Sequence, residues 1–399
     1  MGRETISPGV RQKAVLAAAE TRSFARGEAV LRAVGEVELS GRHLGRLAHQ
    51  VGSKLSEEDR RRSAEHERRR LPVEVENPPE LAVIEVDGGR VHTRQPGRGV
   101  GARGVAWRES KNAVLMRMHS TPQEEDPTPD LPATFLDRGR VKQLVAGLKG
   151  QGGDAEQPPG EAGQPPGEAE QPAGSLPEPP AGPPSYRGPK RLMRTCLSSL
   201  TDSQEFGRRL AAEAHRKAFY LAGRRAFVAD GLKQNWAIHR RHFRSFTPIV
   251  DFLHAVSYVY HAAVAVAGEE DFAWGLAAEL IEACWQGRVG EVIDDLTRWR
   301  EQQPRPAGGE PPAGNDPLSV VGRAVTYLSN NRRRMNYPEY RKLGLPITSA
   351  LAESLIKEIN YRVKGSEMFW NDPEGADSIL ALRAAALSED NRLQLAIKN

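Results

Sequence analysis

The sequence LAVIEVD at residues 81–87, followed by Gly88–Gly89, decides the fold that we expect for this chain. The run is short, mostly apolar and rich in β-branched residues, as buried strands are. Two glycines directly after such a run favour a two-residue hairpin turn, so residues 90–94 are expected to form the returning strand. Asp87 would then end the first strand. A third strand is expected within residues 105–118, which predicts an antiparallel meander of three strands.

Further along the chain, two more short apolar runs alternate with helical patterns. A helix is expected at residues 206–222, followed by a buried strand at 224–231 (RRAFVADG) that ends in Asp230 and a glycine. Residues 246–253 (FTPIVDFL) predict another strand, which runs into an apolar helix at 255–266. Alternation of strand and helix implies that these later strands are parallel and extend the meander.

The pattern from Ser349 to Lys364 predicts a late amphipathic helix, with Ser349 as its N-cap. Glu353 and Lys357 fall on its polar side, together with Asn360, and leucine, isoleucine and valine residues take the other side. Two interpretations remain open from this stretch alone. The helix is either an ordinary charged surface helix or one that presents Glu353 to a site.

The order of these elements is that of a ribonuclease-H-like mixed sheet, so the predicted fold class is α/β. In that architecture the first and fourth strands are neighbours, which would bring Asp87 beside Asp230. Glu353 on the late helix would complete a set of three carboxylates. Such a cluster repels itself unless a cation stabilises the charged forms. Two Mg²⁺ ions suit oxygen ligands and also serve phosphodiester chemistry.

The remaining segments define the expected domain organisation. Residues 1–71 read as all-helical, and residues 151–190 are rich in proline and glycine, with QPPGEA at 157 and again at 164, which predicts a disordered insertion. The catalytic domain would occupy 80–150 and 191–267. An α-helical insertion is expected at 268–343 and the C-terminal catalytic helices at 344–399.

Within the N-terminal region, a helix at 24–34 and a second one capped by Ser40 suggest either a helix-turn-helix for a DNA major groove or a structural helical hairpin. In the first case the second helix would carry a row of outward polar side chains, Arg42, His43, Arg46, His49 and Gln50.

Charge and cysteine content exclude several classes of protein. Lys and Arg number 56 against 52 Asp and Glu, so the formal charge of +4 does not by itself indicate a nucleic-acid binder. Cys196 and Cys284 are too few for a cysteine-rich zinc site or a disulfide framework. No apolar run is long enough to span a membrane, and no secretory h-region is found. We expect a cytoplasmic protein.

Several segments together resemble a bacterial insertion-sequence transposase of the DDE class, and most closely its Kra-type branch. The resemblance covers most of residues 80–390, and its most specific part lies at the C-terminal end. The segments are VDGGR at 86–90, WRESK at 107–111, VADG at 228–231, DFLHA at 251–255, GLPI at 344–347 with the helix through Lys364, MFW at 368–370 and ALR at 381–383.

The resemblance implies metal-dependent cleavage and strand transfer of a DNA element, with Asp87, Asp230 and Glu353 as the catalytic, metal-binding triad. Mg²⁺ or Mn²⁺ would be the cofactor. Double-stranded DNA, both the terminal repeats and the target, would be the partner of a nucleoid-associated homo-oligomer. The alternative is a catalytically inactive DNA-binding protein derived from such an element and acting as a repressor or scaffold.

Some residue assignments stay open at this point. Asp251, at the end of the next strand, competes with Asp230 for the second position of the triad. His254 and His261 lie seven residues apart on one helix, where they either line the site or are ordinary helix-face histidines. Nucleic-acid contacts are expected from Lys357, Arg362 and Lys364 on the late helix, which are otherwise solvated, and from Trp370, which either stacks on a base or fills the core.

Overall fold

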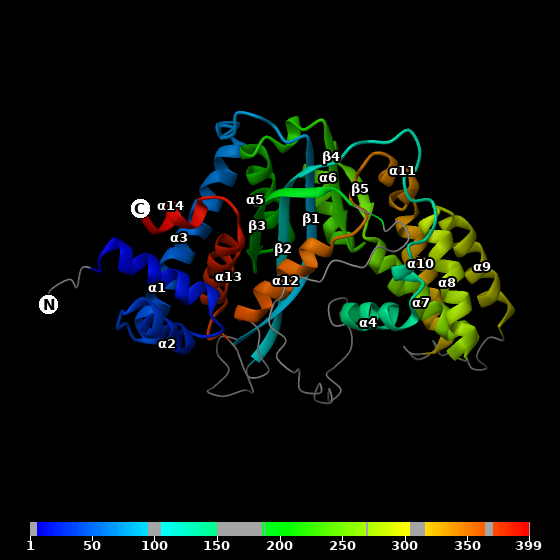
Figure 1. Cartoon of the computed structure of the whole chain (residues 1–399), viewed down its shortest axis with the longest axis horizontal. Coiled ribbons are helices and arrows are strands. Elements are labelled where there is room, and N and C mark those ends of the chain that lie inside the picture. The colour runs from blue at the N-terminus through cyan, green and yellow to red at the C-terminus, as the bar shows by residue number, and fades with distance from the viewer. Residues whose placement is uncertain are drawn as a thin grey trace.

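The chain folds around one five-stranded mixed sheet that carries helices on both sides (Figure 1). The computed structural model describes residues 6–94, 105–149, 186, 188–268, 270–303, 316–363 and 370–398. The predicted α/β class is confirmed. Most of the expected Pro/Gly-rich insertion at 151–190 lies outside the described residues.

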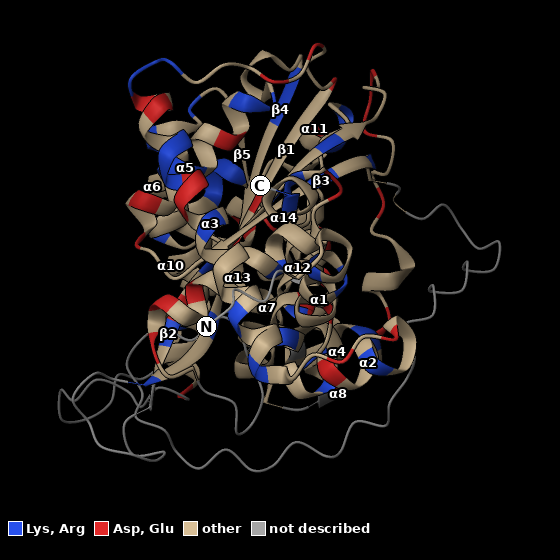
Figure 2. Cartoon of the chain, turned by 90° about the vertical axis from the view of Figure 1, so that its left-hand side faces the viewer, with Lys and Arg blue, Asp and Glu red and all other residues tan. Residues whose placement is uncertain are grey.

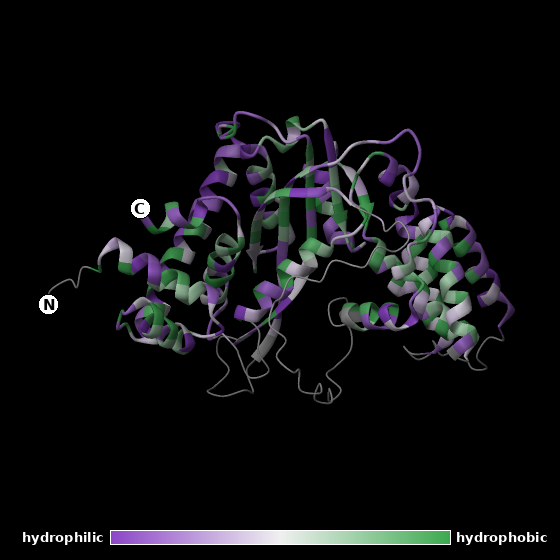
Figure 3. Ribbon diagram, viewed as in Figure 1, coloured by the Kyte–Doolittle hydropathy of each residue, from purple (hydrophilic) through white to green (hydrophobic). Residues whose placement is uncertain are grey.

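The sheet has the strand order β3-β2-β1-β4-β5. Three strands pair in an antiparallel meander, and two later strands extend the sheet parallel to β1, on its other side. Apolar residues fill the strands, and Figure 3 shows them concentrated in the sheet and in the helices of the α7–α10 region. The strands are β1 (Leu81–Arg94), β2 (Val105–His119), β3 (Lys190–Ser199), β4 (Arg224–Ala229) and β5 (Thr247–Val250).

The hairpin turn expected at Gly88–Gly89 is wrong. β1 continues through both glycines to Arg94, pairing Gly88 with Lys111 and Gly89 with Ser110. A type I′ turn requires left-handed backbone at both positions, and neither glycine adopts it. Glycine is needed at 89 for another reason: a Cβ there would lie 2.6 Å from the Ser110 Oγ of the neighbouring strand.

The third strand of the meander also differs from the expectation. It is β3, which follows the Pro/Gly-rich segment, whereas residues 105–119 form the second strand. The segment therefore separates the second strand from the third. Asp87 consequently lies in the middle of β1 rather than at its end, although it stands where the pairing of β1 with β4 stops.

Helices pack against the sheet and against each other. α12 contacts β1 and β2, α13 contacts β3, and α5 lies between β2 and α3. Figure 2 shows basic and acidic residues interspersed on the outer helices α3 and α5. The helices of this part are α5 (Ser203–Arg216), α6 (Lys233–His242), α12 (Ala350–Val363), α13 (Pro373–Leu387) and α14 (Arg392–Lys398), whereas α4 (Arg138–Lys149) packs against α7 (Phe252–Ala267).

The helical character expected for residues 270–340 is found in the described residues there. The helices of this region form a bundle at one end of the sheet (Figure 1). They are α7 (Phe252–Ala267), α8 (Glu270–Trp285), α9 (Val289–Gln302), α10 (Pro317–Asn331) and α11 (Tyr337–Lys342). No helix among the described residues is both long and apolar enough to cross a membrane.

The N-terminal region is packed on the C-terminal helices. It comprises α1 (Pro8–Glu20), α2 (Phe24–Gly35) and α3 (Gly41–Glu67), and Ser40 caps α3 as expected. α3 lies against α13 so closely that a Cβ on Gly52 would come within 2.0 Å of the Ser378 carbonyl oxygen. Close backbone approach of this kind needs glycine.

Candidate active site

Three aspartates lie level with one another at the point where the parallel part of the sheet ends. Asp87 is in β1, Asp230 follows β4 and Asp251 follows β5. The residue before each aspartate pairs with the residue before its neighbour, so the next position along all three strands is an aspartate. Their exposed fractions are 4%, 8% and 0% respectively. The parallel register therefore brings Asp87 and Asp230 to the same edge of the sheet.

Asp230 is oriented by its own loop. Its Oδ1 accepts hydrogen bonds from the Leu232 amide at 3.0 Å and from Asn235 Nδ2 at 2.9 Å. Burial raises the pKa of Asp230, and the charge of Asp251 adds to that increase, while protonated His254 and the two hydrogen bonds oppose it. Among the hydrogen bonds of the described residues, Oδ1 alone accepts, which leaves Oδ2 as the free coordination position of this carboxylate.

Asp251 has both carboxylate oxygens engaged. Oδ1 accepts from the Leu253 amide at 2.9 Å and caps α7. Oδ2 accepts from Ser349 Oγ at 2.5 Å and contacts His254 Nδ1 at 3.1 Å. Asp251 therefore joins β5, α7 and the segment before α12.

His254 places a positive charge beside the three carboxylates. Burial lowers its pKa, but the hydrogen bond to Asp251 and the charges of Asp251, Asp230 and Asp87 raise it more, to about 9. The imidazole is therefore protonated at neutral pH. His261, the other histidine of the pair, contacts the Ser257 carbonyl of its own helix through Nδ1, at 2.6 Å. The two histidines accordingly have different surroundings.

The start of α12 is fastened to the sheet beside Asp87. Glu85, buried to 1% exposure, accepts the Ala352 amide at 2.8 Å through Oε2. Strand side chains alternate faces, so Glu85 and Asp87 share one face of β1. Asp87 Oδ1 accepts from the Gly88 amide at 2.6 Å. Glu353 follows Ala352 in the first turn of α12, and its side chain lies outside what the structure describes.

The donor chemistry of this edge suits a hard divalent cation, because carboxylate oxygens are the ligands that Mg²⁺ prefers. Among the residues whose side chains are described, no three His, Cys, Asp or Glu side chains already converge on a common metal position. Glu353 is not one of those residues. Asp87 and Asp230 therefore provide a pair of oxygen donors, and α12 brings the backbone of Glu353 to the same edge.

The residues expected to contact nucleic acid lie in different surroundings. Lys357 is exposed on α12. Arg362 is only 1% exposed: its Nε donates to the Ala18 carbonyl at 2.9 Å and its guanidinium lies 4.5 Å from the Phe24 ring centre. A guanidinium so enclosed joins α12 to the N-terminal helices and is not presented to a phosphate.

Trp370 is half-buried, and its Nε1 donates to the Val363 carbonyl at 3.1 Å, which fits the core alternative better than base stacking. Lys364 lies outside the described residues. On α3, Arg42, Arg46 and Gln50 are exposed, but His49 turns inward and contacts Ser378 Oγ at 2.7 Å.

Sequence reasoning missed the anchoring role of Glu85 and the contact between Ser349 and Asp251. A usable signal existed for Glu85, because a carboxylate inside an apolar strand, two residues from Asp87, must find a buried partner. No comparable signal existed for Ser349, which was expected to cap α12. No protein-family model matches the chain, and no curated protein matches its sequence.

Proposed function

We propose that this chain is a DNA transposase of the DDE class, which cleaves and joins phosphodiester bonds at the ends of a mobile element. The observation that carries the proposal is the level arrangement of Asp87 and Asp230 on adjacent parallel strands, beside the first turn of α12, which contains Glu353. Carboxylates that lie side by side can hold the two metal ions of phosphodiester chemistry.

The strand order supports the ribonuclease-H-like part of the proposal. An antiparallel meander extended beside its first strand by two parallel strands is the arrangement expected for that fold. The helices between β5 and α12 are then an insertion into it.

Each acid has a role in this proposal. Asp87, Asp230 and Glu353 would hold Mg²⁺ or Mn²⁺, which would supply activation of the attacking oxygen and stabilisation of the leaving oxygen. Asp230 is preferred over Asp251 because its Oδ2 is not used by the protein, whereas both oxygens of Asp251 are. Asp251 and Ser349 position the segment that leads into α12.

The alternative is a catalytically inactive, transposase-derived protein that binds DNA as a repressor or scaffold. It is favoured by one observation: His254 already supplies a positive charge to the aspartates, so part of their repulsion is offset without a cation. The two functions differ in their response to divalent metal, since only the first predicts strand cleavage.

Nicking of supercoiled DNA that carries the sequences flanking the gene distinguishes them. We expect nicking that requires Mg²⁺ or Mn²⁺ and falls by about a hundredfold or more in Asp87→Asn and in Glu353→Gln, because each loses a metal-binding charge. An Asp87→Asn variant that nicks as fast as the parent would rule out the triad. DNA binding without any nicking by the parent would establish the alternative.

A further inference from the structure

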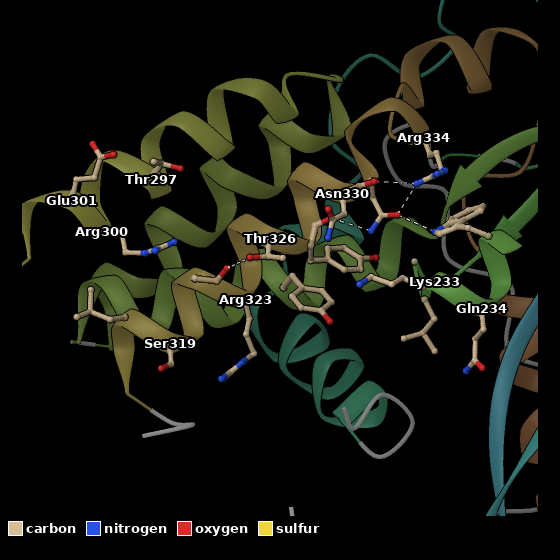
Figure 4. A pocket seen from close by; sticks show the side chains of 18 of the residues that line it. Lys233, Gln234, Thr297, Arg300, Glu301, Ser319, Arg323, Thr326, Asn330 and Arg334 are labelled. Atoms are coloured by element: carbon tan, nitrogen blue, oxygen red, sulfur yellow. Dashed lines mark hydrogen bonds between the residues drawn. The ribbon is translucent and has the colours of Figure 1, made fainter. Parts of the chain in front are cut away.

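A large cleft opens directly beside Asp230. Its volume is about 1610 Å³, and α6, α9 and α10 form its walls (Figure 4). Gly231 and Leu232, the residues after Asp230, form one end, and the far end lies between the last turns of α9, from Thr297 to Glu301, and Leu318 and Ser319 of α10. The cleft exceeds the roughly 300–1,000 Å³ of usual small-molecule sites.

The walls of the cleft are strongly basic. Among the described residues, five cationic side chains line it, with Glu301 as the one acid: Lys233, Arg240, Arg300, Arg323 and Arg334. Figure 4 shows Arg300 on α9 and Arg323 on α10 along the same cleft. Amides and hydroxyls, among them Gln234, Thr326 and Asn330, occupy the positions between them. Such a lining is complementary to a chain of phosphates.

The cleft on the other side of α9 has the opposite balance of charge. The neighbouring cleft between α8 and α9, of about 560 Å³, is lined by Glu279, Glu282, Glu291 and Asp295 with two arginines. The side of α9 that faces α10 carries Arg300 and Glu301, and the side that faces α8 carries Arg298 beside Asp295.

The end near the aspartates is rigidly built. Tyr327 of α10 donates its hydroxyl to the Asp230 carbonyl at 2.9 Å and stacks on Tyr258 of α7 at 3.8 Å between ring centres. Arg334 lies over Trp236 of α6 at 4.4 Å. The cleft wall and the backbone of Asp230 are therefore parts of one hydrogen-bonded unit.

We infer that this cleft binds the backbone of the DNA strand that flanks the scissile phosphate. The inference rests on the proposed function. It assigns a substrate-binding role to the helical bundle, a role that does not follow from the aspartates themselves. From Ser319 to Asn331, α10 rises about 18 Å, the length of about five nucleotides of a B-form strand. Arg300 and Arg323 contact phosphates away from the reacting group.

The test measures binding of a labelled DNA duplex in EDTA by fluorescence anisotropy over a series of salt concentrations. We expect the double variant Arg300→Ala/Arg323→Ala to lose affinity by tenfold or more at about 0.1 M salt. The slope of log K against log salt should fall in magnitude by about 2, since each lost phosphate contact removes about 0.9. Arg300→Lys/Arg323→Lys retains both charges and should bind like the parent.

The matched control is Arg298→Ala/Arg333→Ala, which removes two exposed arginines from neighbouring positions outside the cleft. It should leave the slope unchanged. Equal slopes for the cleft variant and the parent, with both folded by circular dichroism, would overturn the inference. So would an equal loss in the control pair, because the effect would then be one of total charge.

Failure of this inference is distinguishable from failure of the proposed function. Binding in EDTA needs no catalysis. If the parent never nicks DNA but the cleft variant shows a smaller salt dependence of binding, the DNA-binding role of the cleft is supported and the proposed enzymatic function fails. If the parent nicks DNA in Mg²⁺ and the cleft variant binds DNA like the parent, the proposed enzymatic function is supported and the DNA-binding role of the cleft fails.

Discussion

Three buried aspartates at one sheet edge repel one another, and His254 offsets part of that repulsion. Because its pKa is raised to about 9, the imidazole keeps its positive charge at neutral pH. His254 therefore supplies a counter-charge to this cluster from within the protein. As a result, Asp87→Asn and Asp230→Asn are suitable for activity measurements, since removing one of these negative charges relieves repulsion, whereas Asp251→Asn also removes the hydrogen-bonded partner of protonated His254.

Gly231 determines how the loop after Asp230 turns. Its φ is +100°, and a Cβ there would lie 2.6 Å from Tyr327 Cε2. We expect Gly231→Ala to lower the free energy of unfolding by roughly 2 to 4 kcal/mol, from left-handed backbone strain together with the clash. Urea denaturation measures the change.

Gly275→Ala in α8 provides the matched control, because nothing lies within 4 Å of the added Cβ and the backbone is helical. It should stabilise the chain by up to about 1 kcal/mol. A Gly231→Ala variant as stable as the parent would mean that the loop beside Asp230 has another conformation.

At the scale of the element, α12 is positioned by contacts from strands rather than by its own cap. The buried carboxylate of Glu85 accepts the Ala352 amide. We expect Glu85→Ala to cost roughly 2 kcal/mol of stability and to abolish the hydrogen-exchange protection of that amide, because its hydrogen-bond acceptor is lost from a buried position. Exchange at Ala352, followed by NMR, measures the effect locally.

Glu85→Gln serves as the rescue variant, since its side-chain oxygen still accepts a hydrogen bond. It should restore most of the protection at Ala352. If the amide stays protected in Glu85→Ala, then α12 is held by other contacts and the role assigned to Glu85 is wrong.

Elements whose signal is local could be predicted from the sequence. The strands at 224–229 and 247–250, the apolar helix after the second of them, and the Ser40 cap of α3 all follow from short-range patterns and agree with the structure. The absence of a turn at Gly88–Gly89 could not be recognised from the local sequence. The glycine at position 89 is explained by the close approach of Ser110 from the neighbouring strand. β3 was not predicted, because charged residues are interspersed in its first half, a pattern that also fits a linker.

Arg362 and Trp370 show the same limit within the candidate site. Their positions on the late helix and after it suggested contacts with DNA. The N-terminal helices bury Arg362, however, and the sequence of the late helix alone does not indicate that other helices pack over it. Asp87 and Asp230 lie next to each other as expected, because the strand order and the parallel register place them together, although Asp87 lies within β1 and does not end it.

At the scale of the whole molecule, α3, α5 and α14 meet in a buried ionic network. Glu213 of α5, 3% exposed, accepts from Arg216 and from Arg392 of α14 at 2.8 and 2.5 Å. Burial raises the pKa of Glu213, but Arg392 and Arg216 outweigh it and bring the pKa from 4.5 to about 2. This junction joins the N-terminal region to the chain's last helix.

The network predicts a loss of stability in acid. Because the folded pKa of Glu213 is depressed, its contribution of roughly 3 kcal/mol is present above pH 4.5 and is lost as the pH falls toward 2. We expect Glu213→Gln to be less stable than the parent at neutral pH, with a shallower decline of stability on acidification. Urea midpoints at successive pH values measure both curves.

Glu124→Gln, at an exposed loop position, is the control and should follow the parent curve. Parallel curves for Glu213→Gln and the parent below pH 4.5 would contradict the assignment, because the acid-sensitive group would then lie elsewhere.

The central claim is that Asp87 and Asp230, and not Asp251, provide the sheet carboxylates of a metal-dependent DNA-cleaving site. The most direct test compares Mg²⁺-dependent nicking by Asp230→Asn and Asp251→Asn, both confirmed as folded, with nicking by the parent. We predict that Asp230→Asn loses activity by about a hundredfold or more, as Asp87→Asn does, whereas Asp251→Asn keeps most of it. Nicking by Asp230→Asn at the parent rate, with activity lost in Asp251→Asn, would contradict the claim.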